Sequence, residues 1–390
     1  MHVGLEVLAA QDFRNLETFR IEPGPRFNLF EGRNGQGKTN LLEAVYLLSA
    51  FRSPRDAKQG ELVRFGAERA VVYGEIVRRE VKRTVEIQLA KEGKKVLLDG
   101  KVITRMPSSF SHMAAVLFGP DDLELTKAGP EVRRRFLDRA TFAVWPEHLL
   151  ELRAYHEALK HRNRLLRDAK VRGVALDPHV LDAFEGELAR RGASVLMRRH
   201  LFLERFVVHF AEAFRQITDG ELTATLTHKA SGFDHADSHK ASGSEAAGRD
   251  FGVAAMPSVA LELAAALSRA RASDAKLGWT RLGPHADELD LMIDGRPVRA
   301  FASQGQHRAF VLALKIAELH RIHEAHGVYP VFLLDDVSSE LDERRNALLM
   351  ETLQRGGGQV FVTTTDRRWI RVGDDAMRRW KVEAGVLSAE

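Results

Sequence analysis

The 390-residue sequence predicts an α/β protein in which both ends of the chain build one domain, the head, and a helical lobe is inserted between them. Strand-like alternation of apolar residues occurs near both ends, whereas the sequence after Pro130 has a helical pattern. A phosphate-loop motif follows an early strand, and the acidic residues that such a loop needs end a strand close to residue 335. These observations assign residues 1–130 and 277–390 to the head and residues 131–276 to the lobe.

The composition excludes several kinds of protein. The chain has no cysteine, which excludes disulfide frameworks, thiolate zinc sites and cysteine nucleophiles and suits a reducing cytoplasm. Its N-terminus lacks the basic start and apolar core of a secretory signal, and no apolar stretch approaches the roughly 20 residues of a membrane span. We therefore expect a cytoplasmic protein without membrane contact. The net charge of +4, from 58 basic and 54 acidic residues, points only weakly to nucleic acid.

The first hundred or so residues read as strands interrupted by one helix. Residues 3–31 alternate as short strands, and the dense apolar spacing that begins at Thr39 predicts a buried helix. Alternation resumes over residues 70–103, where Asp99-Gly100 is typical of a hairpin turn. This segment is expected to form a sheet within the head.

Residues 32–39 fit the phosphate-loop pattern G-x-x-x-x-G-K-[ST], between an apolar run at 27–30 and the predicted helix. The glycines let backbone N–H groups turn inward around phosphates, and the N-terminus of the helix adds its dipole. Lys38 is expected to reach the β and γ phosphates of ATP as a catalytic cation, and the Thr39 hydroxyl to bind Mg²⁺. The expected nucleotide contacts are Gly32, Asn34, Gly35, Gly37, Lys38, Thr39 and Asn40.

The acidic partner of this loop is predicted at the end of the apolar strand 331–334. Four apolar residues run directly into Asp335 and Asp336, as in a Walker B strand. Asp335 is the candidate for holding the metal ion through water. Asp336 is the candidate catalytic residue that orients the attacking water.

The inserted lobe is predicted to be a basic, antiparallel helical hairpin. An apolar stripe along residues 152–166 marks one helix, and the pattern resumes at Leu181 after Gly173 and Pro178. Between residues 131 and 173 there are eleven Lys or Arg against six Asp or Glu. A neighbouring basic stripe is a candidate DNA contact, although a solvated helix face would show the same pattern: Arg153, Lys160, Arg164 and Arg167.

Residues 228–250 are rich in small and polar residues and predict a mobile surface loop near the end of the lobe. His228, His235 and His239 suggest a metal site, but histidines in a polar loop are usually solvated, so no metal is expected there. Beyond residue 277 the α/β pattern returns, and a long helix is predicted after Ser303.

Two further motifs flank the Walker B strand and resemble those of ABC-type ATPases. The segment around Ser303 and Gly305 resembles the signature motif, and residues 338–342 resemble the D-loop. In that family the signature presents a serine hydroxyl and glycine N–H groups to the γ-phosphate of the opposite subunit. Ser303, Gly305 and Gln306 are the corresponding expected contacts, although Ser-Gln-Gly-Gln taken alone is also an ordinary helix cap.

Over essentially its whole length the chain resembles the RecF family of bacterial DNA replication, recombination and repair proteins. The resemblance implies an ABC-type, SMC-like P-loop ATPase head with an inserted helical lobe, and an ATP-dependent homodimer. It also implies binding to duplex DNA and to single-strand/double-strand junctions, and cooperation with RecR and RecO in loading RecA. Besides the phosphate loop, the motifs that carry it are residues 13–15, 51–53, 118–121, 129–138, 160–163, 283–285 and 303–308, the last of which includes the signature.

Departures from the expected motifs concern hydrolysis. Ala286 and Glu288 stand where a basic residue and an aspartate are expected. No glutamine suitable for a Q-loop occurs between residues 101 and 130, so Asp121 or Asp122 is the candidate substitute, and the switch histidine of transporters is missing. Hydrolysis is therefore expected to be slow.

Three alternative functions predict other sequence features or another turnover. An ATPase subunit coupled to another partner, such as a transporter, would carry that glutamine and that histidine. A structural SMC protein would need a far longer insertion. A nucleotide-sensing scaffold would differ from a slow ATPase only in turnover.

Overall fold

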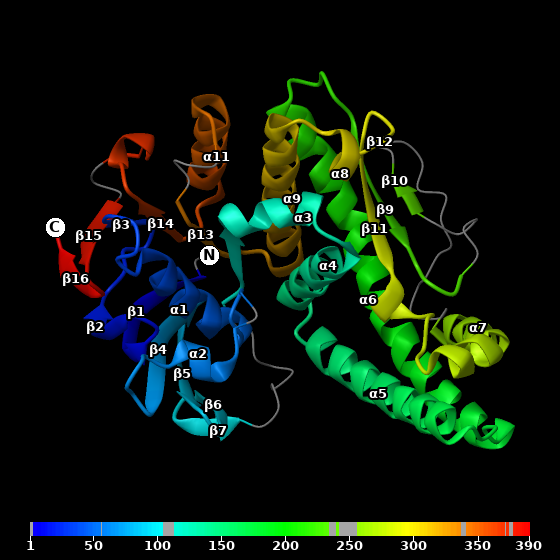
Figure 1. Cartoon of the computed structure of the whole chain (residues 1–390). Helices are drawn as coiled ribbons and strands as arrows, with labels where there is room; N and C mark the ends of the chain where they lie inside the picture. The colour runs from blue at the N-terminus through cyan, green and yellow to red at the C-terminus, as the bar shows by residue number, and fades with distance from the viewer. Residues whose placement is uncertain are drawn as a thin grey trace. The chain divides into compact units, whose positions relative to one another are not determined.

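The computed structural model describes residues 3–55, 57–103, 113–233, 239–241, 256–336, 341–370, 372–373 and 377–390, and for 239–241 it describes the backbone alone. The chain folds into two compact units. The first, the head, contains Met1–Leu123 and Val311–Glu390, and the second, the lobe, contains Glu124–Phe310. The blue N-terminal and the orange-to-red C-terminal parts of the chain in Figure 1 together build the head, as the sequence predicts.

One sheet of the head is mainly parallel and carries the two predicted nucleotide motifs. Its order is β16-β15-β3-β14-β13-β8, and only β16 is antiparallel to its neighbour. Apolar side chains fill the central strands, which suits a parallel sheet covered on both faces. The strands are β3 (Phe27–Glu31), β8 (Ala115–Phe118), β13 (Val331–Leu334), β14 (Val360–Thr364), β15 (Met377–Glu383) and β16 (Val386–Ala389).

The second sheet of the head is antiparallel, in the order β2-β1-β4-β5-β6-β7. Asp99 and Gly100, with φ of 49° and 74°, form the tight turn between β6 and β7, so the predicted hairpin is confirmed. Its strands are β1 (Val3–Phe13), β2 (Leu16–Ile21), β4 (Arg69–Arg78), β5 (Val81–Ala90), β6 (Gly93–Leu98) and β7 (Lys101–Ile103).

Helix α1 (Lys38–Ala50) touches strands of both head sheets, including β1, β4, β8 and β13 (Figure 1). Almost all of its residues are buried, which explains why its sequence is apolar around its whole circumference. The predicted helix beginning near Thr39 is thus confirmed. The other helical segments of the head are α2 (Gln59–Leu62), η1 (Pro120–Leu123), α11 (Glu343–Gly356) and η5 (Arg367–Trp369).

The lobe is built on the predicted helical hairpin. Helix α5 (His148–Arg172) ends at Gly173, whose φ of 65° suits a left-handed C-cap, and α6 (Pro178–Ile217) returns along it. Helix α7 (Met256–Leu277) packs against both. The lobe also contains the short helix α3 (Glu124–Lys127) and α4 (Pro130–Val144).

A small antiparallel sheet completes the lobe and corrects one expectation. His228, assigned by sequence to a mobile loop, lies in β9 (Ala224–Lys229), where it is buried and bonded to Asp287. His239 begins β10 (His239–Ala241), and His235 falls outside the described residues. Strand β9 pairs on its other side with β11 (Glu288–Ile293), which continues through a turn to β12 (Arg296–Pro297).

The boundaries of the lobe differ from the expected 131 and 276. Strand β11 pairs along its length with β9, and the 3-10 turn η4 (Pro284–Ala286) contacts α6, so residues 277–310 fold with the lobe. Helix α8 (Val298–Phe301) belongs there too, and α9 (Gln304–His326) runs across the boundary at residues 310 and 311. No helix among the described residues is long and apolar enough to cross a membrane.

Candidate nucleotide-binding site

The phosphate loop joins the end of β3 to the start of α1, and its glycines have distinct steric reasons. Gly37 has φ of 107°, a left-handed conformation, and a Cβ there would lie 2.7 Å from the Asn15 side chain. A Cβ on Gly32 would lie 2.3 Å from the carbonyl oxygen of Val382. The loop therefore turns in a way that only glycine allows at these positions.

Lys38 lies at the first position of α1 and points back into the loop. Its Nζ donates to the carbonyl oxygens of Gly32, at 2.5 Å, and Arg33, at 2.9 Å. Burial lowers the pKa of Lys38, while the nearby Asp336 and Asp335 carboxylates act to raise it. The ammonium group is thus held inside the loop that the sequence assigns to phosphates.

The two predicted metal ligands meet although they are far apart in sequence. The Thr39 hydroxyl donates to Oδ1 of Asp335 at 3.0 Å. Burial raises the pKa of Asp335, and its hydroxyl donors act against that shift. Because Mg²⁺ prefers hydroxyl, carboxylate and water oxygens, this pair fits the group that the motif implies.

Thr363 organises the acidic end of β13, and sequence reasoning did not single it out. Its buried hydroxyl donates to Oδ1 of Asp335 at 2.7 Å and accepts the backbone N–H of Asp336 at 3.1 Å. Asp336 has φ of 48°, a left-handed conformation uncommon outside glycine, and such strain often occurs at functional sites. A polar residue ending the apolar strand β14 was the available signal.

The turn at residues 14–15 connects the N-terminal hairpin to the loop. Asn40 donates to the Asn15 side chain at 2.8 Å, so the predicted contact residue Asn40 is held beside Gly37. Arg14 binds Glu43 through two hydrogen bonds of 2.9 Å each. These contacts attach the polar turn after β1 to the first turns of α1, next to the phosphate loop.

The C-terminal hairpin supports the loop from the other side, which the sequence did not predict. The backbone N–H of Ala384 donates to the Gln36 side chain at 2.6 Å, and that of Gly385 donates to the Gln36 carbonyl at 3.0 Å. Asn34 and Gly35 are exposed at the loop's surface. The backbone of the loop is therefore bonded to the β15–β16 turn, while its outer face is open.

The candidate Q-loop aspartates lie in different surroundings. Asp122 forms an ion pair with Lys315 at 2.8 Å and accepts the backbone N–H of Gly119 at 3.0 Å. Asp121 is exposed, 4.0 Å from Arg55. Of the two, Asp121 has the carboxylate that faces solvent.

The signature residues lie in the lobe, at the start of α9. The backbone N–H of Ser303 donates to Gln306 Oε1 at 2.7 Å, and the backbone N–H of Gln306 donates to Ser303 Oγ at 3.2 Å. This reciprocal pair is a capping box. Ser303 is exposed, so its side chain caps the helix and remains accessible. The D-loop motif falls largely outside the described residues, which resume at Leu341.

The proposed DNA stripe lies on one helix. Arg153, Lys160, Arg164 and Arg167 are all exposed on α5, and Arg164 is 3.8 Å from Asp168. Two of the three arginines at 133–135 are engaged within the lobe. Arg133 is buried and paired with Glu288 at 2.8 Å, and Arg134 donates to the backbone of Asp287.

A phosphate loop whose threonine meets the aspartate of a second parallel strand, a helix that touches both head sheets, and an inserted helical lobe define an ABC-type, SMC-like ATPase. Residues 4–388 match the family model described as RecF/RecN/SMC N terminal domain. The chain belongs to the RecF family.

Two curated relatives illustrate the family relationship. The "DNA replication and repair protein RecF" of Anaeromyxobacter sp. (strain Fw109-5) is 44% identical, covering 98% of each chain. That of Myxococcus xanthus (strain DK1622) is 38% identical, covering 96% of this chain and 94% of its own.

Solved structures agree with this assignment. The structure described as the recombination mediator protein RecF-ATPrS in the RecFOR pathway superposes with a TM-score of 0.86 at 29% identity, covering 100% of this chain and 98% of its own. An Smc head bound to the C-winged helix domain of ScpA superposes with a TM-score of 0.53 at 15% identity, which shows the shared fold.

Proposed function

We propose that this chain binds ATP and Mg²⁺, forms a homodimer on DNA when ATP is bound, and is reset by slow hydrolysis. The observation that carries the proposal is the meeting of Thr39 with Asp335 beside the inward-pointing Lys38. In this site Lys38 would hold the β and γ phosphates, and Thr39 and Asp335 would hold the metal ion, which stabilises the developing charge when bound.

The biological process is gap repair. The relatives are named DNA replication and repair proteins, and a similar structure is described as a recombination mediator of the RecFOR pathway. We assign the chain to the same process, in which it binds duplex DNA and single-strand/double-strand junctions in the cytoplasm. RecR and RecO are the proposed partners, and loading of RecA is the proposed outcome.

One experiment tests the main claim. Binding to gapped, single-stranded and duplex DNA is measured with and without Mg-ATP, while light scattering follows monomer and dimer. We expect ATP to produce the dimer and to strengthen DNA binding, because two subunits on one duplex double the phosphate contacts. ATP binding without a change in either oligomeric state or DNA affinity would overturn the proposal.

Replacing Asp336 by Asn should separate binding from turnover. The amide keeps the size of the side chain but cannot act as a base, so ATP hydrolysis should fall by about 100-fold while ATP still binds. Phosphate release and ATP affinity are measured together, with Glu80→Gln, an exposed change in the β4–β5 turn, as the control. Unchanged phosphate release would move the catalytic role to another residue.

Replacing Lys160 and Arg164 by Ala together should weaken duplex binding and its dependence on salt. Each phosphate contact releases about one counterion, so the slope of log K against log salt should flatten by roughly two units. ATP binding should survive.

Arg355→Ala with Arg368→Ala is the matched control for the salt experiment. It removes the same charge from exposed positions of the head. A wild-type slope in the lobe variant would place the DNA elsewhere, near Arg52, Arg55 and Lys58 of the head.

A further inference from the structure

The segment between α7 and η4 is bonded on both sides of Trp279. Before it, the backbone N–H of Gly278 donates to the Asp274 carbonyl at 2.7 Å. After it, the backbone N–H and the hydroxyl of Thr280 both donate to Oδ1 of Asn163, each at 2.7 Å. The backbone that carries the indole is therefore fixed to α5 and α7.

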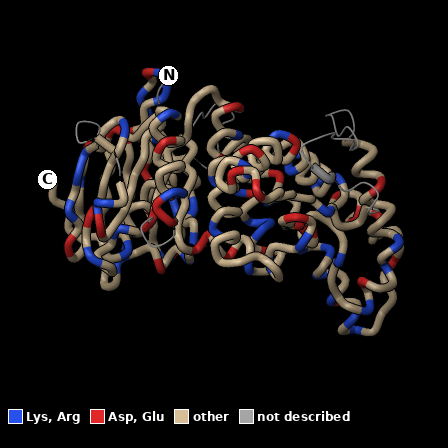
Figure 2. Tube along the Cα trace, turned by 90° about the horizontal axis from the view of Figure 1, so that it is seen from above, with Lys and Arg blue, Asp and Glu red and all other residues tan. Residues whose placement is uncertain are grey.

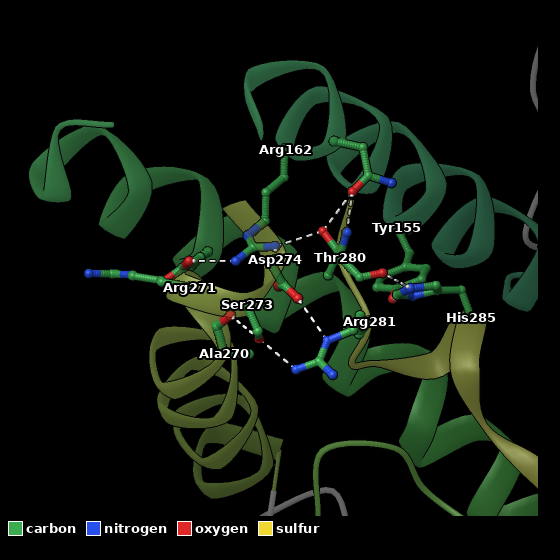
Figure 3. Close-up of polar contacts among 11 residues, drawn as sticks. Tyr155, Arg162, Ala270, Arg271, Ser273, Asp274, Thr280, Arg281 and His285 are labelled. Carbon is green, nitrogen blue, oxygen red and sulfur yellow. Dashed lines mark hydrogen bonds and ion pairs between the residues drawn. The ribbon is translucent and has the colours of Figure 1, made fainter. Parts of the chain in front are cut away.

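A buried arginine strengthens this attachment. Arg162 is fully buried on α5, and its guanidinium donates to Asp274 at 2.8 Å, to Glu185 at 2.8 Å and to the Thr280 hydroxyl at 2.7 Å. In Figure 3 a dashed line joins the Arg162 guanidinium to the Thr280 hydroxyl. Asp274 of α7 and Glu185 of α6 bind the same guanidinium. Buried charge networks of this kind are costly to rearrange, so Thr280 and its neighbour are held in place.

The indole itself remains open. Trp279 is 50% exposed, and among the described residues no hydrogen bond, ion pair or ring contact involves it. Two other tryptophans, unlike Trp279, pack against neighbouring side chains. Trp380 is buried against Phe30, and Trp145 lies under Arg198. A large aromatic side chain that is half exposed on a fixed backbone is typical of a contact residue.

The backbone just before Trp279 lies against basic residues of α5. A Cβ on Gly278 would lie 3.1 Å from the Lys170 side chain and 3.9 Å from Arg167 Cα, and Lys170 donates to the Leu277 carbonyl at 3.0 Å. One face of α5 carries Lys160, Asn163, Arg167 and Lys170, because these residues are spaced by three or four positions. Asn163 is the residue that accepts the hydrogen bonds of Thr280. The backbone that carries Trp279 thus lies beside the proposed DNA stripe.

Overall charge does not locate a binding face, because Lys and Arg alternate with Asp and Glu over both units in Figure 2. An exposed aromatic residue next to basic residues of α5 does locate a candidate binding face. We propose that Trp279 stacks on an unpaired base of a single-stranded segment, while the stripe on α5 holds the adjoining phosphates. The proposal rests on the DNA binding proposed above and adds the residue that selects unpaired bases.

Stacking explains the selectivity in physical terms. Every base has a π face, so an aromatic residue binds single strands without regard to sequence. In a closed duplex these faces are covered by neighbouring base pairs. The cations of α5 beside Leu277 and Gly278 favour a polyanion over a protein partner as the group that Trp279 contacts.

The test compares three DNA circles: single-stranded, closed duplex, and duplex with a single-stranded gap. Circles are used because the single-stranded and closed duplex circles offer no duplex ends for stacking. Trp279→Ala should weaken binding to the single-stranded and gapped circles by about tenfold and leave the closed duplex unchanged. Trp279→Phe should restore most of the loss, since it keeps an aromatic ring. Single-stranded DNA should also quench the fluorescence of wild type more than that of Trp279→Phe.

Leu261→Ala, an exposed apolar change on α7, is the matched control and should bind all three circles like wild type. Wild-type affinity of Trp279→Ala for all three circles would overturn base stacking. An equal loss on all three circles would also overturn it, by assigning Trp279 a structural role. Neither result would contradict the proposed DNA binding by the stripe on α5. That proposal is tested separately by the salt slope of the variant with Lys160 and Arg164 replaced by Ala.

Discussion

Replacing Lys38 by Met should abolish productive ATP binding. Each hydrogen bond from the ammonium group to a phosphate is worth about 1.5–3 kcal/mol, so losing these bonds should weaken ATP affinity by roughly 100-fold. The structure adds a second expectation. Lys38 also binds the carbonyl oxygens of Gly32 and Arg33, so the variant should be slightly less stable even without nucleotide. Isothermal titration with Mg-ATP and thermal unfolding measure the two effects separately.

The control for this variant is Lys101→Met, at an exposed position of β7 in the same unit. A free ligand concentration of 100 times Kd stabilises a protein by about 2.7 kcal/mol. Mg-ATP at that concentration should therefore raise the Tm of wild type and of the control. At the same ATP concentration the Tm of Lys38→Met should rise much less, because its affinity is expected to be about 100-fold weaker. Wild-type ATP affinity in Lys38→Met would show that the phosphate loop has been assigned incorrectly.

The parts of the site that the sequence predicted are those with local signals. The loop at 32–39 is a continuous motif between a strand and a helix, and the strand 331–334 is a short apolar run ending in two carboxylates. Each pattern identifies its own element. That Thr39 and Asp335 meet could be expected only because both motifs are known to act together.

The parts that the sequence missed depend on pairing between distant strands. Strand β15 pairs with β3, and this register brings the turn at Ala384 against Gln36 of the loop. Nothing in residues 377–390 identifies that partner. Thr363 was likewise visible as a polar residue after an apolar run, but its bonds to Asp335 and Asp336 follow from the parallel pairing of β14 with β13.

The lobe shows the same limit for polar residues. His228 lies in a stretch that is polar on average, yet it is buried because Asp287 accepts its hydrogen bond and β11 pairs with its strand. Arg162 lies next to the exposed positions of the basic stripe, yet it is fully buried. Composition predicts exposure for such residues, whereas a buried partner of opposite charge reverses it.

Replacing Ser303 by Arg should prevent the ATP-induced dimer while leaving ATP binding by the monomer nearly intact. The reason lies in the proposed action of Ser303 on the nucleotide of the facing subunit, where an arginine would collide. The substitution also breaks the capping box with Gln306, which costs about 1 kcal/mol of helix stability, so a second pair of variants is needed.

Ser303→Asn and Ser303→Asp separate the two effects, because both residues are good helix caps of nearly equal size. The aspartate places a negative charge where the γ-phosphate of the partner's nucleotide would lie, whereas the asparagine does not. Sedimentation velocity with Mg-ATP should therefore give dimers for Ser303→Asn, and monomers for Ser303→Asp and Ser303→Arg. Dimers in all three variants would refute a head-to-head arrangement. Monomers in all three, with wild-type ATP affinity, would show that dimerisation needs the serine hydroxyl itself rather than only an uncharged cap.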